Sequence, residues 1–132
     1  GNSFKNMIRD LSVDFPDFLI AITNWYGIVP QEGYFENKDD HAGELETSVM
    51  MYYHPELVNL EEAGEGTSKP FALSSLNAQI AWLPRYWSKV SADTGIGDPR
   101  KSTPEKGERY AKAVIEKLAL LFTEIGSKEV YL

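Results

Sequence analysis

The sequence predicts an α/β fold, and three observations carry that prediction. Residues 18–23 (FLIAIT) form a continuous apolar, partly β-branched run, which is typical of a strand buried on both faces of a parallel sheet. Apolar residues recur at helical spacing both before and after this run. The resulting order of helix, strand, long loop, helix, loop and helix is typical of the α/β class, and 132 residues suit a single domain.

The first element is expected to be an amphipathic helix. Apolar side chains recur at positions 4, 7, 8 and 11, the spacing that places them on one helical face. Asn2 or Ser3 can cap its start, and Pro16 ends it because proline cannot continue a helix. The predicted strand then leads into Trp25 and Tyr26. Ligands bind beyond the carboxyl ends of such strands, so these rings are candidate pocket walls; aromatic packing under a loop is the alternative.

The second half of the chain contains two more predicted helices. Residues 27–40 indicate a loop, and a helical pattern follows from His41 to just before Pro55. Residues 59–70 are acidic, glycine-rich and expected to be exposed, residues 71–90 are ambiguous, and Pro84 argues against a central strand there. After a turn-rich loop at 94–99, Thr103 and Pro104 begin a helix that Gly126 ends. Its apolar face predicts a core-packing helix.

Composition and charge exclude several functions. The chain has 13 Lys and Arg against 20 Asp and Glu, a net charge of −7, and this opposes binding to a nucleic-acid backbone. It has no cysteine, which excludes disulfides, thiol nucleophiles and iron–sulfur sites. Because the longest apolar runs are far shorter than a membrane span and no leader pattern opens the chain, we expect no membrane segment and a cytoplasmic location.

One dense cluster of titratable side chains could carry chemistry. Asp39, Asp40 and His41 are followed by Glu44 and Glu46. An imidazole beside carboxylates could act as a general acid or base next to a metal-activated water. On a regular helix His41 would pair with Glu44, whereas Glu46 could approach His41 only if the first turn is irregular. The alternative is a capped helix start with solvated charges.

The cluster belongs to a set of motifs that resembles the creatininase (creatinine amidohydrolase) family. The matching segments are residues 40–48 (DHAGELETS) with 50–51 and 55–58, residues 95–99 and 102–107, and residues 1–4 (GNSF). They occur in the family's order across the chain. The resemblance implies a three-layer α/β/α fold around a mainly parallel sheet, of which residues 1–132 would form the C-terminal portion. It also implies a metal-dependent hydrolase of carbon–nitrogen bonds that assembles as a homo-oligomer, commonly a hexamer.

The resemblance implies roles for individual residues. His41 corresponds to the catalytic histidine, a proton shuttle, and Asp40 to its acidic neighbour. Glu46 is a candidate metal ligand or support for one, and Trp25 corresponds to a tryptophan that closes over substrate. The family's cofactor is a zinc- or manganese-type divalent metal, often binuclear. Asn2 and Asn37 match substrate-contacting positions.

The chain departs from the family pattern at Gly1, where a metal-binding glutamate is expected, and at Asn37, where a tryptophan is expected. These departures favour another cyclic amide, linear amide or formamide over creatinine as the small-molecule substrate. The family's other metal ligands are absent from these residues, so the 132 residues alone are expected to be inactive. A non-catalytic α/β interaction module and a peptide-processing hydrolase of the same family are the alternatives.

Overall fold

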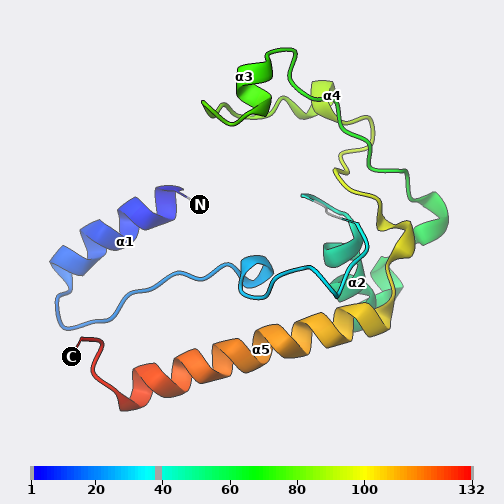
Figure 1. Cartoon of the computed structure of the whole chain (residues 1–132). Coiled ribbons are helices and arrows are strands. Elements are labelled where there is room, and N and C mark those ends of the chain that lie inside the picture. Colours follow the sequence, from blue (N-terminus) through cyan, green and yellow to red (C-terminus); the bar gives the residue numbers. More distant parts are fainter. Residues whose placement is uncertain (1, 38–39, 132) are drawn as a thin grey trace. The chain divides into compact units, whose positions relative to one another are not determined.

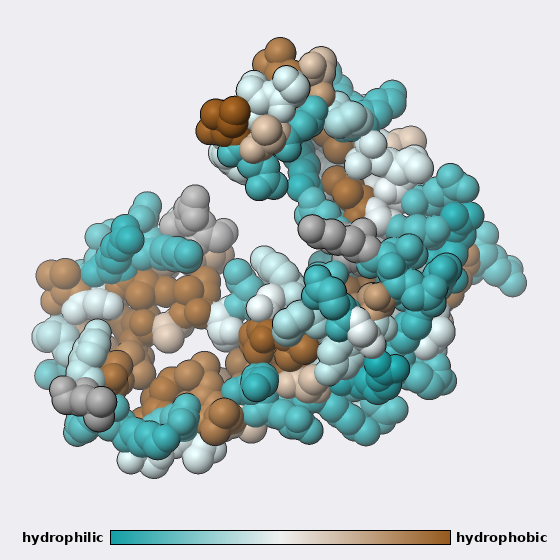
Figure 2. Space-filling model, in the orientation of Figure 1, coloured by the Kyte–Doolittle hydropathy of each residue, from teal (hydrophilic) through white to brown (hydrophobic). Residues whose placement is uncertain are grey.

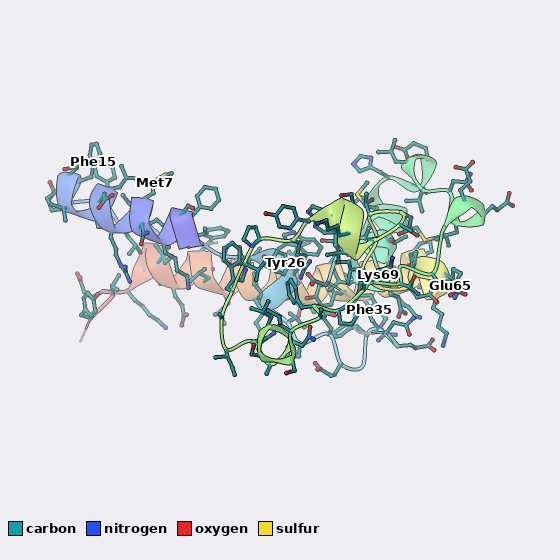
Figure 3. All side chains as sticks on the ribbon, turned by 90° about the horizontal axis from the view of Figure 1, so that it is seen from above. Met7, Phe15, Tyr26, Phe35, Glu65 and Lys69 are labelled. Carbon is teal, nitrogen blue, oxygen red and sulfur yellow. The ribbon has the colours of Figure 1, made fainter. Side chains whose placement is uncertain are left out.

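The computed structural model describes residues 2–37 and 40–131, and the chain divides into two compact units, Gly1–Pro30 and Gln31–Leu132. The first unit contains α1 (Asn2–Asp14) and the short 3-10 helix η1 (Trp25–Gly27). Met7 and Phe15 extend into solvent from this part of the chain (Figure 3). The predicted first helix is therefore present and ends just before Pro16. Several of its apolar side chains, Phe4 and Met7 among them, are exposed.

The prediction of a three-layer α/β/α fold with a parallel sheet is wrong for this structure. No β-strand occurs in residues 2–37 and 40–131; the β-pairing described there consists of isolated bridges. Residues 19–24 are extended without ladder partners, and Phe18 and Leu19 are 69% and 53% exposed. A strand needs a neighbour to satisfy its backbone N–H and C=O groups, and no second segment of the described chain lies alongside this one as a strand.

The second unit is built on the packing of α2 (Glu44–Tyr53) against the start of α5 (Pro104–Ser127), as Figure 1 shows. Leu45 of α2 and Tyr110 and Val114 of α5 are buried together at this contact. Gly107 lets the two backbones approach closely, because a Cβ there would lie 2.0 Å from the carbonyl oxygen of Ser48. The rings of Tyr34 and Phe35 pack on Tyr110, with centroids 5.4 and 5.2 Å away.

The boundaries of α5 follow the sequence closely. The Thr103 hydroxyl accepts a hydrogen bond from the backbone N–H of Lys106 at 3.2 Å, and Pro104 occupies the first turn. The helix ends at Ser127, one residue beyond the predicted stop. Only its first half is buried, however. Ile115, Leu121 and Phe122 are exposed, so the expectation of a core-packing face holds for the start of the helix and not for its end.

Short elements connect these helices. They are η2 (Pro55–Leu57), η3 (Leu60–Glu62), α3 (Ser74–Asn77), α4 (Trp87–Val90) and η4 (Pro99–Lys101). Pro84 lies outside any strand, as predicted. Figure 2 shows apolar side chains at the surface of α1 and of the last turns of α5. Among the described residues, no helix is long and apolar enough to cross a membrane.

Candidate functional site

His41 lies in an extended segment just before α2, and the loop around Ile96 fixes its backbone. The N–H groups of Asp40 and His41 donate to the carbonyl oxygen of Ile96 at 2.9 and 3.1 Å, and the N–H of Ile96 donates back to His41 at 2.8 Å. The turn-rich 94–99 loop, far away in the sequence, therefore supports the histidine. These bonds hold the backbone while leaving the imidazole ring available.

The turn between His41 and α2 brings Glu46 to the histidine. Ala42 has a φ of 52°, in the left-handed region that non-glycine residues seldom adopt. Its N–H donates to Oε2 of Glu46 at 2.6 Å, and the same carboxylate oxygen lies 3.7 Å from Nδ1 of His41. This is the irregular first turn that an approach of Glu46 requires. The imidazole is half exposed, so a reacting group could reach it from solvent.

An aromatic ring and a guanidinium group also lie close to Asp40 and His41. The Trp87 ring lies 5.1 Å from the His41 ring, centroid to centroid, at an angle of 57°. Arg85 forms an ion pair with Asp40 and lies over the Trp87 ring at 5.7 Å. The structure thus joins Asp40, His41 and Glu46 into one cluster with Arg85 and Trp87. Sequence reasoning missed the last two, because they come from the ambiguous 71–90 segment and no motif singles them out.

Glu44 does not pair with His41, which corrects the helix-spacing expectation. Its carboxylate is fully buried and binds groups other than the imidazole. Oε2 accepts hydrogen bonds from the N–H groups of Glu36 and Asn37 at 2.9 and 2.8 Å, and Oε1 contacts Nζ of Lys106 at 2.5 Å. The hydrogen bond to Glu44 raises the pKa of Lys106 above its ordinary value and keeps the ammonium charged.

The remaining predicted residues are distributed over the chain. The amide Nδ2 of Asn37 donates to the carbonyl oxygen of Asp98 at 3.4 Å, beside the His41 loop. Trp25 lies in η1 of the first unit, where its ring meets Tyr26 edge to face at 6.1 Å, and Asn2 begins α1. Gly1 and Asp39 lie outside the described residues.

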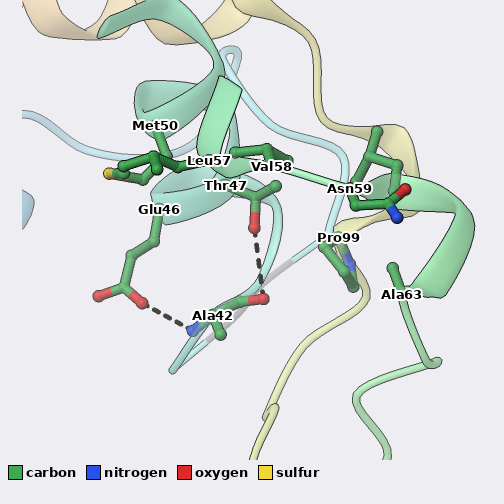
Figure 4. Close-up of a pocket in the computed structure, with 10 residues that line it drawn as sticks. Ala42, Glu46, Thr47, Met50, Leu57, Val58, Asn59, Ala63 and Pro99 are labelled. Carbon is green, nitrogen blue, oxygen red and sulfur yellow. Dashed lines mark hydrogen bonds between the residues drawn. The ribbon is translucent and has the colours of Figure 1, made fainter. Parts of the chain in front are cut away.

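A cavity of about 320 Å³ opens beside Glu46 (Figure 4). Its floor comes from the first turns of α2, where the Thr47 hydroxyl donates to the carbonyl oxygen of Ala42 at 3.4 Å. Met50, Leu57 and Val58 make the wall mostly apolar. The cavity therefore places a mostly apolar wall next to the Glu46 carboxylate in this unit.

The described residues do not form a metal site by themselves. In that part of the chain no group of three or more His, Cys, Asp or Glu side chains is placed to hold an ion. An open zinc site takes about three protein ligands, and His41 and Glu46 could supply at most two. The cluster instead places the His41 imidazole 3.7 Å from the Glu46 carboxylate, an arrangement suited to general acid–base chemistry.

Comparison with known proteins agrees with the motifs. The family model for creatininase, described as creatinine amidohydrolase, matches residues 1–122. A Bacteroides fragilis protein assigned as a creatinine amidohydrolase is 61% identical, with a TM-score of 0.94 over 98% of this chain and 51% of its own. A creatininase with a tryptophan-to-phenylalanine substitution is 19% identical, with a TM-score of 0.68 over 92% of this chain and 48% of that one.

Two solved forms of a creatininase with a glutamate-to-glutamine substitution are also similar, one complexed with creatine and one of Zn–Zn type. Each is 21% identical, with a TM-score of 0.68, over 92% of this chain and 49% or 48% of the other. No curated protein matches. The chain spans about half the length of the solved structures to which it is similar.

Proposed function

The chain belongs to the creatininase family, and from this premise we propose that it forms part of a metal-dependent hydrolase of carbon–nitrogen bonds in small amides. The observation that carries the proposal is the half-exposed imidazole of His41. The ring lies next to Glu46, and hydrogen bonds to Ile96 fix the His41 backbone. Exposure allows contact with a substrate, and the fixed backbone limits the motion that would misplace a proton.

His41 is proposed as the proton shuttle of the reaction. Amide hydrolysis adds the hydroxyl of a water molecule to the carbonyl carbon, breaks the C–N bond and delivers a proton to the leaving nitrogen. Imidazole suits that delivery because it exchanges a proton near neutral pH. Glu46 lies on the Nδ1 side of the ring, at 3.7 Å, so Nε2 is the proposed point of proton exchange with substrate.

Asp40, Trp25, Asn2 and Asn37 are proposed to contribute to catalysis or to substrate binding. Arg85 forms an ion pair with Asp40, which anchors that side chain in the His41 cluster. Asn37 carries an amide within hydrogen-bonding reach of Asp98, and the same group could bind a substrate carbonyl or N–H. Trp25 has a partly exposed ring that could cover a flat amide.

A divalent metal, zinc or manganese and in one or two copies, is proposed as the cofactor. The support is the Zn–Zn form of a similar creatininase, and such an ion polarises a carbonyl and lowers the pKa of bound water. Since Glu46 is a single candidate ligand, we propose that the other ligands come from polypeptide beyond these 132 residues.

The proposed substrate is a small cyclic amide, linear amide or formamide. A similar creatininase is complexed with creatine, which supports a small polar molecule of this kind. Asn37 stands where the family pattern has a tryptophan, which favours a substrate other than creatinine. We also propose a homo-oligomer, on the family resemblance, and a cytoplasmic location, in keeping with a chain that lacks cysteine.

The test is a pair of histidine substitutions in the intact protein. His41→Ala should lower kcat on the best substrate among creatinine, 2-pyrrolidinone, N-methylformamide and short peptides by about 10²–10⁴-fold. His54→Ala is the matched control, because His54 is exposed and its ring pairs with its sequence neighbour Glu56, 3.2 Å away, rather than with the His41 cluster. Bound metal is measured in each protein. If His41→Ala keeps full activity, His41 is not the shuttle; if no tested substrate is hydrolysed and no metal is bound, a non-catalytic module replaces the enzyme.

A further inference from the structure

Glu44 is the fully buried acidic residue in the described part of the chain, and its partners are neither His41 nor Glu46. It is the first residue of α2, with 0% exposure. A buried carboxylate is costly unless charge and hydrogen bonds compensate it. Here the compensation is complete: two backbone N–H groups donate to one oxygen, and Lys106 binds the other. Each oxygen of the Glu44 carboxylate therefore has a defined partner.

The bonds to Glu44 tie backbone that precedes the catalytic candidates to the helix that follows them. The N–H groups of Glu36 and Asn37 donate to the Glu44 side chain at 2.9 and 2.8 Å. Asp40 and His41 lie between Asn37 and Glu44 in the sequence. Glu46, in the same turn of α2, accepts a hydrogen bond from the N–H of Ala42 at 2.6 Å. The two carboxylates of the first turn of α2 therefore bind backbone groups on both sides of His41.

Lys106 connects Glu44 to α5. Its ammonium donates to the Glu44 carboxylate, to the carbonyl oxygen of Lys101 at 2.8 Å and to Oε1 of Glu36 at 3.3 Å. Lys106 belongs to the first turn of α5, which packs directly on α2. The ion pair of Glu44 and Lys106 thus ties the backbone bound by Glu44 to the packed helices α2 and α5.

We propose that Glu44 is a positioning residue for His41, because it binds the backbone of Glu36 and Asn37 and anchors it on the α2–α5 pair through its ion pair with Lys106. The proposal rests on the role proposed for His41. A displacement of about 1 Å in a catalytic group can cost about 10²-fold in rate, so loss of these bonds should affect turnover more than substrate binding.

The test compares two glutamine substitutions in the intact protein, assayed on its best small amide. Glu44→Gln is expected to lower kcat at least 10-fold with KM within about 3-fold. The Asn37 and Glu36 amides should also exchange with solvent faster. Glu36→Gln is the matched control: it removes a carboxylate from the same lysine but leaves both backbone donors and Glu44 in place. It should keep kcat and the slow amide exchange.

The proposal is overturned if folded Glu44→Gln protein keeps wild-type kcat, or if kcat and amide exchange change equally in Glu36→Gln. Should Glu44→Gln fail to fold, Glu44→Asp decides the matter. It keeps the negative charge but shortens the side chain by one methylene, which withdraws the acceptor from the backbone N–H groups of Glu36 and Asn37, so a normal kcat would refute positioning. His41→Ala separates the two hypotheses: if it abolishes activity while Glu44→Gln does not, only the positioning role fails.

Discussion

Replacing Gly107 with alanine tests the close approach of α2 and α5. A Cβ at this position would lie 2.0 and 2.4 Å from the carbonyl oxygen and carbon of Ser48, and 2.9 Å from the backbone nitrogen of Val49. All three atoms belong to the backbone of α2, so no side-chain rotation can relieve the clash. The helices must separate by roughly 1 Å or more, which loosens the packing of Leu45 against α5.

The magnitude follows from two opposing effects. Overpacking costs typically 1–3 kcal/mol, and a backbone clash belongs near the upper end at about 3 kcal/mol. Alanine in a helix returns about 1 kcal/mol relative to glycine. We therefore expect Gly107→Ala to lower the free energy of unfolding by about 2 kcal/mol, equivalent to about 8 °C in melting temperature for a domain of this size.

The assay is thermal and urea unfolding followed by circular dichroism, with Gly126→Ala as the control. Gly126 lies in the same helix, and no heavy atom beyond its own helix and chain neighbours lies within 4 Å of the Cβ position. This variant should be as stable as wild type or slightly more so. Equal stability of the two variants would refute the close packing of α2 on α5.

Further predictions concern the cap, the core and one acidic group. Thr103→Ala should cost about 1 kcal/mol of stability through the lost N-cap, whereas Thr123→Ala, which removes only an exposed hydroxyl, should cost less; chemical denaturation measures both. Tyr110→Ala should cost about 3–5 kcal/mol in the same assay, because the ring is fully buried. The Arg100 guanidinium lowers the pKa of Asp98 from 3.8 to about 2. The pair of Asp98 and Arg100 should therefore stabilise the fold above pH 4, and this effect should fade as the pH falls towards 2. NMR titration of the Asp98 carboxyl checks this: an ordinary pKa that does not change in Arg100→Met would contradict the pairing.

Local signals in the sequence predict the helices well. Thr103 and Pro104 mark the start of α5 because capping and proline stereochemistry act within one turn. Pro16 likewise marks the end of α1. The approach of Glu46 to His41 also depends on neighbours in sequence, through the turn at Ala42 and Gly43.

Features that depend on distant partners were not predictable. The apolar run 18–23 has the composition of a strand, yet pairing requires a second strand, and the described residues provide none. The charge pair of Glu44 and Lys106 joins residues 62 positions apart, so no local pattern reveals it. Arg85 reaches Asp40, and Trp87 reaches His41, from a segment without helical or strand periodicity.

The most direct test of the account is chemical rescue of His41→Ala in the intact protein. The proton-shuttle role predicts that kcat falls by about 10²–10⁴-fold and that added imidazole restores turnover in proportion to its concentration, because the native ring is half exposed. His54→Ala should need no rescue. Wild-type kcat for His41→Ala in the absence of imidazole would contradict the proposed role of His41.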